Sequence, residues 1–243
     1  MKIELHKLTE NAENLIEKAC RVCYQSYHRY NPPESTKELI PKVIRKGHYS
    51  ILEHASATFK LTDVSRVLTH ELVRHRLASF SQESQRYVCY ADKPNRKKTK
   101  DFIYNIPNSV KKWQLEGPES YRDMLSDNPQ WSVTGFHEYE KLVLQCYDMY
   151  ERMLSDGVPP EDARYILPNA TCCDIFITAN LREWRHIFEV RGNPRAHWEI
   201  RIAICRCFEI LKEKCSNVFY DMELINPNNV IDEDSYIILN KGK

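Results

Sequence analysis

Apolar and polar residues follow two different periods along the chain, which predicts a mixture of strands and helices. The segments 2–8, 55–62 and 170–180 alternate or are strand-like, and a period of two is typical of half-buried strands. Apolar residues recur at helical spacing in six other segments. We therefore expect helices over 9–24, 35–47, 64–76, 136–154, 181–191 and 195–215, with a further helix start in 157–168.

Single residues indicate where some of these elements begin, end or turn a face to the core. Asp63 is a good cap for the helix that follows it, and Pro41 is expected to interrupt the second helix early. In the first helix, Leu15, Ala19 and Val22 share one face and form its apolar stripe.

The order of these elements indicates one α+β domain over 1–243. The chain of 243 residues is long enough for one sizeable core, and neither an internal repeat nor a linker divides it. The stretch 91–135 is polar, aromatic and contains prolines, so we expect a variable excursion there.

Charge and hydropathy exclude several classes of protein. The formal net charge is +1, so no overall field attracts nucleic acid or an anionic membrane. The first residues have no apolar run typical of a signal peptide, and no stretch reaches the roughly 20 apolar residues of a membrane span. We expect a cytoplasmic protein.

Cysteines and glycines give little support for a metal or a common nucleotide loop. Cys20 and Cys23 have the spacing of half a zinc site or a redox pair, but no second pair completes it, so a structural role is favoured. The six glycines form neither a GxGxxG nor a GxxxxGK[ST] array.

The segment RHRLASFSQESQR, residues 74–86, combines clustered cations with hydroxyl groups. Three basic residues at the end of a helix can simply complement its partial negative charge. Ser79, Ser84 and Arg86 extend the pattern, however, and arginine together with serine suits a phosphate group. The residues alone favour an anion site and do not identify an enzyme.

The spacing within 74–86 resembles the signature of flavin-dependent thymidylate synthases, Arg-His-Arg followed by serine and arginine at fixed distances. Other blocks are similar to that family in the same order. They are GHYSILEH (47–54), DARYILP (162–168), NLREWRHIFEVR (180–191) and AHWEIR (196–201).

This resemblance implies a fold, a reaction and an assembly. The fold would be a central, mostly antiparallel sheet surrounded by helices, unrelated to the Rossmann fold. The reaction would be reductive methylation of dUMP to dTMP, with methylenetetrahydrofolate as carbon donor and FADH2, regenerated by NADPH, as hydride donor. The assembly would be a homotetramer with shared active sites.

The resemblance also implies the site residues, with no metal among the ligands. The predicted dUMP positions are Glu71, Arg74, Gln82, Glu83, Ser84, Gln85, Arg86, Arg164 and Arg191. The predicted FAD positions are Ser50, Glu53, Arg74, His75, Arg76, Asn180, Arg182 and His186, with His48 as a possible flavin or folate contact.

Arg191 matches the arginine that polarises the uracil ring and is the predicted catalytic residue. Ser84 could be read as a nucleophile, but no histidine–acid pair is evident to deprotonate it, and a role as a nucleotide ligand is favoured. Glu71 stands where many relatives carry glutamine, and Cys23 where some carry serine near the flavin phosphate.

Two other readings compete with the synthase. A nucleic-acid-binding protein could insert the helix before residue 77 into a groove, but it would need more basic residues along that helix, where Glu71 lies instead. A flavin- or nucleotide-binding protein that has lost catalysis would not need Arg86, Arg164 and Arg191 together.

Overall fold

The computed structural model describes residues 1–88 and 136–240, and the excursion predicted for 91–135 lies outside these residues. The described residues form two compact units. The first comprises 1–62, 68–82 and 174–240, and the second comprises 63–67, 83–88 and 136–173. Strands and helices are mixed throughout, which confirms the predicted α+β class.

A four-stranded sheet forms the base of the first unit. Its strands are β1 (Lys2–Leu8), β2 (Ser56–Ser65), β4 (Cys172–Asn180) and β3 (Ser79–Gln82), in the spatial order β1-β2-β4-β3. Both outer pairs, β1 with β2 and β3 with β4, are antiparallel. In β2, Ala57, Phe59 and Leu61 are buried on one face, as the alternation predicts.

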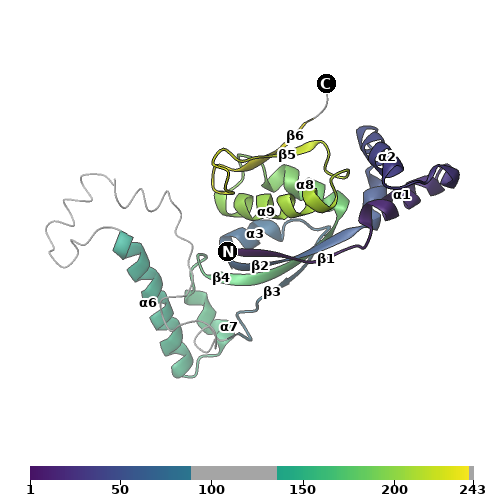
Figure 1. Cartoon of the computed structure of the whole chain (residues 1–243). Coiled ribbons are helices and arrows are strands. Elements are labelled where there is room, and N and C mark those ends of the chain that lie inside the picture. The colour runs from purple at the N-terminus through teal and green to yellow at the C-terminus, as the bar shows by residue number, and fades with distance from the viewer. Residues whose placement is uncertain (89–135, 241–243) are drawn as a thin grey trace. The chain divides into compact units, whose positions relative to one another are not determined.

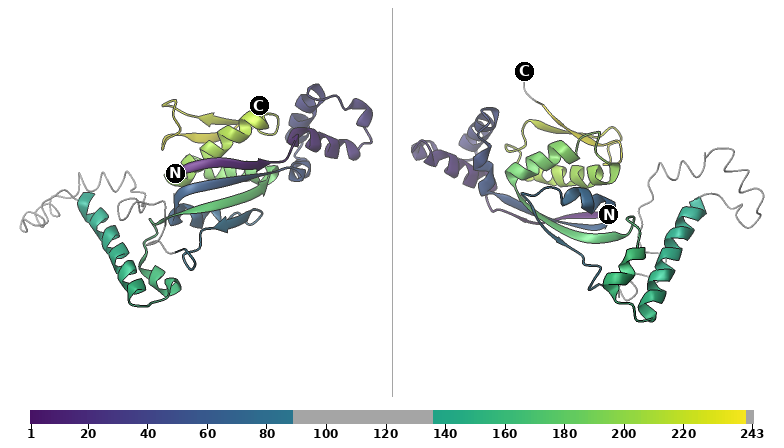
Figure 2. Two further views of the ribbon diagram at one scale, coloured as in Figure 1. Left: turned by 60° about the horizontal axis from the view of Figure 1, so that its bottom comes forward. Right: turned by 180° about the vertical axis from the view of Figure 1, so that it is seen from behind.

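Two helices and a hairpin lie over one face of this sheet (Figures 1 and 2). The helices are α8 (Leu181–Arg191) and α9 (Trp198–Lys214), and the hairpin pairs β5 (Met222–Ile225) with β6 (Tyr236–Leu239). Gly192 ends α8 where β6 comes close, and a Cβ atom there would lie 2.6 Å from the Ile237 side chain. A larger residue would therefore push β6 away.

Aromatic rings fill the space between the sheet and the helices. Trp184 contacts Phe59 with ring centroids 5.1 Å apart, and Phe188 contacts Phe208 and Phe219 at 5.2 and 5.4 Å. The Trp184 ring nitrogen donates to the Ala57 carbonyl at 3.1 Å, so no polar group of the indole is left unsatisfied. This cluster fixes α8 on the sheet.

A pair of helices lies at one end of the sheet, α1 (Ala12–Val22) against α2 (Glu34–Arg45) (Figure 1). They are followed by the 3-10 turn η2 (Tyr49–His54), and the turn η1 (Tyr27–Arg29) lies between them. Buried Glu17 accepts from Arg21 at 2.7 Å and from the Thr36 hydroxyl at 2.5 Å. A buried charge that is paired and hydrogen-bonded in this way joins the two helices.

Two expectations for these helices are wrong. Pro41 does not interrupt α2, because the helix continues through it and buries Pro41 with its apolar neighbours. The stripe of Leu15 and Val22 is exposed, because α1 buries Ile16 and the paired Glu17 and Arg21 instead.

In the second unit, α6 (Phe136–Ser155) packs with the short helix α7 (Pro160–Ala163) and the turn η4 (Arg164–Ile166). Their common core contains Val143, Tyr147, Tyr150 and Ala163. The helix predicted over 136–154 is confirmed.

Helix α3 (Arg66–Leu72) begins later than predicted. Asp63 is not its cap but lies within β2, with φ of 55°. The amides of Arg66 and Val67 donate to the carbonyls of Thr171 and Asn169, at 3.0 and 3.3 Å. The first amides of the helix are therefore satisfied without a side-chain cap.

None of the helices in residues 1–88 and 136–240 is both long and apolar enough to cross a membrane.

Candidate active site

A cavity of about 690 Å³ in the first unit collects most of the predicted flavin positions and the predicted catalytic arginine. It lies among η2, the segment that follows α3, and α8. The predicted residues that line it are Glu53, Arg74, His75, Arg76, Asn180, Arg182, His186 and Arg191. Leu77, Glu183 and Val190 complete the lining and were not predicted.

Asn180 sets the start of the helix that presents half of this cavity. Its backbone is extended, and its side-chain oxygen accepts from the Glu183 amide at 2.8 Å, which caps α8. From this cap, Glu183, His186 and Val190 follow at spacings of three and four residues, so they lie on one face of the helix. Arg182 reaches η2 and pairs with Glu53 at 2.5 Å.

His75 is the buried centre of the site, with 6% of its surface exposed. Arg191 Nε donates to His75 Nε2 at 3.1 Å, so Nε2 must be the unprotonated nitrogen. The proton then lies on Nδ1, which donates to Glu183 Oε1 at 3.2 Å. Burial, and then the charges of Arg191 and His186, lower the pKa of His75 to about 4. The imidazole is therefore neutral at neutral pH.

Glu183 accepts the hydrogen bond from His75 Nδ1 through its Oε1 atom. Its burial raises the pKa of the Glu183 carboxyl, while His186 and Arg182 act in the opposite direction. Because His75 is neutral, the contact is a hydrogen bond rather than an ion pair.

The possible metal-ligand atoms of His75, Glu183 and His186 all lie within 4.8 Å of one another, a spacing that could hold a metal ion. Three features oppose a cation there. Arg191 already donates to one ring nitrogen of His75, the other ring nitrogen bears the proton, and Arg182 adds a further positive charge to the cavity. The absence of a metal remains our prediction.

Glu71 does not line the cavity but binds Arg191 directly. Arg191 Nη1 donates to Glu71 Oε2 at 2.7 Å, and Nη2 donates to the Glu71 carbonyl at 3.0 Å. With the bond to His75, the guanidinium is held at all three nitrogens. Glu71 lies in the last turn of α3 and Arg191 ends α8, so these contacts join two helices that are far apart in sequence.

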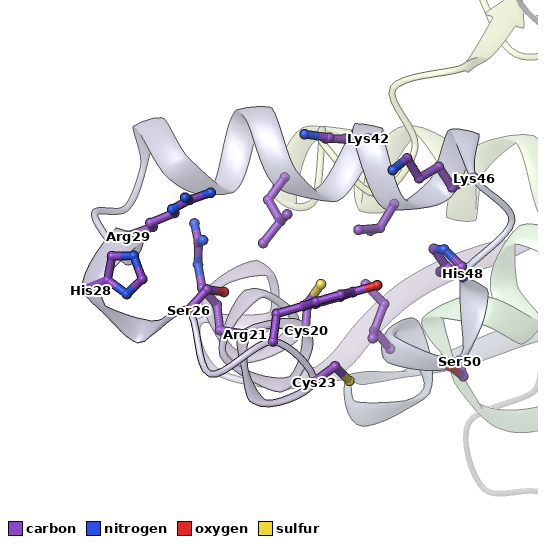
Figure 3. Close-up of a pocket in the computed structure, with 14 residues that line it drawn as sticks. Cys20, Arg21, Cys23, Ser26, His28, Arg29, Lys42, Lys46, His48 and Ser50 are labelled. Atoms are coloured by element: carbon purple, nitrogen blue, oxygen red, sulfur yellow. The ribbon is translucent and has the colours of Figure 1, made fainter.

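A second cavity of about 560 Å³, between α1 and α2, contains the other two predicted flavin-side residues, His48 and Ser50 (Figure 3). Lys42 and Lys46 lie along one of its sides, and Arg29 reaches it from η1. Among the residues that the structure describes, no ion pair joins any of these three cations to an acid. Because Ser50 and Glu53 both belong to η2, this turn contributes to both cavities.

Cys20 and Cys23 also line this second cavity, from α1 and its end. All eight cysteines of the described residues are free thiols. Burial raises the pKa of the Cys20 thiol, so it stays protonated at neutral pH.

The predicted dUMP residues divide between the two units. Gln82 lies on β3 in the first unit, where its amide donates to the Thr69 hydroxyl at 2.8 Å. Four others with local contacts lie in the second unit: the Glu83 carbonyl accepts from Arg66 at 2.8 Å, the Ser84 hydroxyl accepts from the Arg86 amide at 3.2 Å, and Arg164 donates to the Glu161 carbonyl at 3.0 Å. Gln85 lies in the turn between Ser84 and Arg86.

The segment after the Arg-His-Arg cluster contains a strand. Ser79 to Gln82 form β3 and pair with Thr178 to Ile175 of β4. Ser79 is therefore an edge-strand residue, not a loop hydroxyl.

The chain is similar to known proteins along most of its length. Residues 4–216 match the family described as thymidylate synthase complementing protein. The chain belongs to this family.

Three members of this family show how far the similarity extends. A flavin-dependent thymidylate synthase of Geobacter sulfurreducens is 35% identical over 227 residues, covering 91% of this chain and 86% of the relative. The enzyme of the same name from Pyrococcus furiosus is 37% identical, covering 78% of this chain and 68% of the relative. That of Mycobacteroides abscessus is 36% identical, covering 86% and 79%.

Proposed function

We propose that this chain is a flavin-dependent thymidylate synthase, which methylates dUMP to dTMP. FAD is its cofactor, NADPH its reductant and methylenetetrahydrofolate its carbon donor. The observation that supports this most strongly is the cavity where the predicted flavin residues and Arg191 meet, in a chain that matches the family along most of its length.

The residues of the two cavities fit the chemical parts of FAD. The first has a volume within the range of about 300–1,000 Å³ usual for small-molecule sites. Exposed Leu77 and Val190 offer apolar surface to a flat ring, and Asn180 and the arginines offer donors to its carbonyl groups. In the second cavity, the positive charges of Lys42 and Lys46 suit the diphosphate of FAD.

Arg191 is the residue that we assign to the chemical step. Carbon 5 of uracil must become nucleophilic, and a guanidinium against the ring stabilises the negative charge that develops. The two N–H bonds that Arg191 does not give to Glu71 or His75 are available for this contact. When bound, the flavin supplies the hydride. No cysteine lines the cavity of Arg191 among the described residues, so the assignment includes no thiol nucleophile.

The phosphate of dUMP requires cations and hydroxyl donors, which the segment 82–86 and Arg164 offer. Arg86 is exposed and lies over the Tyr87 ring at 5.2 Å, where its N–H groups can still reach an anion. We assign Ser84 as a ligand of the nucleotide, since its hydroxyl already contacts the Arg86 amide.

A homotetramer in the cytoplasm completes the proposal. Exposed apolar residues recur at i and i+7 on two helices, Leu15 and Val22 on α1 and Leu142 and Met149 on α6. Such exposed apolar pairs are suited to contacts between subunits.

The test is the visible spectrum of the purified protein, followed by anaerobic reduction with NADPH and assay of dTMP. We expect a flavin spectrum, bleaching by NADPH that dUMP accelerates, and dTMP only when methylenetetrahydrofolate is also present. Flavin binding without dTMP would instead support the flavoprotein that has lost catalysis. A protein that takes up no FAD would contradict both.

A further inference from the structure

We infer that Glu71 is a positioning residue that fixes the plane and direction of the Arg191 guanidinium. This inference rests on the proposed role of Arg191. It also differs from the expected role of Glu71, which was a direct contact with dUMP.

Arg191 has more hydrogen-bond donors than Glu71 and His75 accept. A guanidinium has five N–H bonds, one on Nε and two on each Nη. Glu71 receives one from each Nη, through its carboxylate at 2.7 Å and its carbonyl at 3.0 Å. His75 receives the bond from Nε at 3.1 Å. Two N–H bonds remain, one on each Nη, and the described residues offer them no acceptor.

The contacts of Arg191 also fix the orientation of its guanidinium. Contacts at three nitrogens define the plane of the group, so the two remaining bonds point in fixed directions. The Arg191 and Glu71 side chains are 20% and 29% exposed, which leaves the pair within reach of a ligand but shields it from much of the solvent. A catalytic cation that is fixed before substrate arrives stabilises charge without reorganisation.

Charge distinguishes the two residues that accept hydrogen bonds from Arg191. His75 is neutral, whereas Glu71 places a carboxylate directly against the guanidinium. Glu71 could thus act through its reach or through its charge, and two substitutions separate these effects. Glu71→Gln keeps the length and an acceptor oxygen but removes the charge, whereas Glu71→Asp keeps the charge but is shorter by one methylene group.

The experiment compares these variants and Glu71→Ala with the unchanged enzyme. The readouts are flavin content, dUMP affinity, thermal stability and the kcat of dTMP formation. Positioning predicts that Asp and Ala lower kcat by roughly 10- to 100-fold, the loss expected when a catalytic group moves by about 1 Å. Gln should stay within about threefold, and dUMP affinity should change little.

Two controls accompany these variants. Glu10→Gln removes a carboxylate from an exposed pair with Lys7 and should leave all readouts unchanged. Arg191→Ala tests the proposed function by itself, because it should abolish dTMP formation while FAD remains bound.

The outcomes distinguish the inference from the function on which it rests. Normal turnover by Arg191→Ala would contradict the assigned role of Arg191 and the inference with it. An inactive Arg191→Ala beside fully active Asp and Ala variants would contradict the inference alone. Weaker dUMP binding at unchanged kcat would mean that Glu71 contacts the nucleotide, and equal losses of kcat and stability in all three variants would mean a merely structural role.

Discussion

His75 is the single residue whose protonation differs most from its ordinary behaviour in water. Folding lowers its pKa to about 4, whereas an unfolded histidine titrates near 6.5. Between these values only the unfolded chain binds the proton, so the free energy of unfolding falls as the pH decreases from about 6.5 to about 4. The loss attributable to His75 should reach about 3 kcal/mol.

Denaturant unfolding at pH 7.5 and pH 4.5 measures this loss for the unchanged protein and for His75→Asn. The variant lacks the titrating ring, so its stability should decrease less between the two pH values. His28→Asn removes an exposed histidine and serves as the control. An equal pH dependence for His75→Asn and the unchanged protein would refute the neutral, buried imidazole.

At the scale of elements, α8 depends on one capping residue that also faces the cavity. The Asn180 side chain accepts from the Glu183 amide, and Asn180→Ala should lower the free energy of unfolding by about 1 kcal/mol. Asn180→Asp preserves the capping oxygen but removes the amide donor that we assign to the flavin. Its stability should therefore match the unchanged protein while its FAD affinity is weaker.

Chemical denaturation and FAD titration of both variants test this separation. If Asn180→Asp is as unstable as Asn180→Ala, the side chain does not act as a cap. If it binds FAD as well as the unchanged protein, the amide does not contact the flavin.

Elements with a long, regular pattern could be predicted from the sequence, and short or irregular ones could not. The alternation in β2 and the helical period in α6 and α8 extend over many residues and give the right elements. The strands β3, β5 and β6 have only four residues each, and their pairing depends on partners distant in sequence. Tertiary contacts also override local signals. The first backbone amides of α3, for example, donate to the carbonyls of residues 169 and 171 instead of to a capping side chain.

The candidate site could also be predicted only in part. The resemblance identifies most of the residues that line the first cavity, but their roles there stay predictions. Glu183 was missed because its importance depends on buried His75, to which no local pattern connects it. The spacing Asn-x-x-Glu at residues 180–183 was the available signal, since it marks a helix start that directs Glu183 and His186 to the same side. The bond between Glu71 and Arg191 joins positions 120 residues apart and has no local signal.

At the scale of the whole molecule, a net charge of +1 means that anion binding depends on local arrangements of charge. Lys42 and Lys46 line the second cavity, have no ion-pair partner among the described residues and are exposed. If they bind the FAD diphosphate, each Lys→Ala substitution should weaken FAD binding roughly two- to fivefold, which corresponds to about 0.5–1 kcal/mol for an exposed ionic contact.

Salt distinguishes this role from a general loss of stability. Ionic contacts between exposed groups weaken as salt rises, so the FAD affinity of the unchanged protein should fall between about 0.05 and 0.5 M salt. The double variant Lys42→Ala, Lys46→Ala should bind FAD more weakly at low salt, and its FAD affinity should decrease less as salt rises. Lys7→Ala, which removes an exposed lysine paired with Glu10, should match the unchanged protein. An unaltered FAD affinity and salt dependence in the double variant would exclude the second cavity as the diphosphate site and leave its cations for another anionic substrate, such as the carboxylates of the folate.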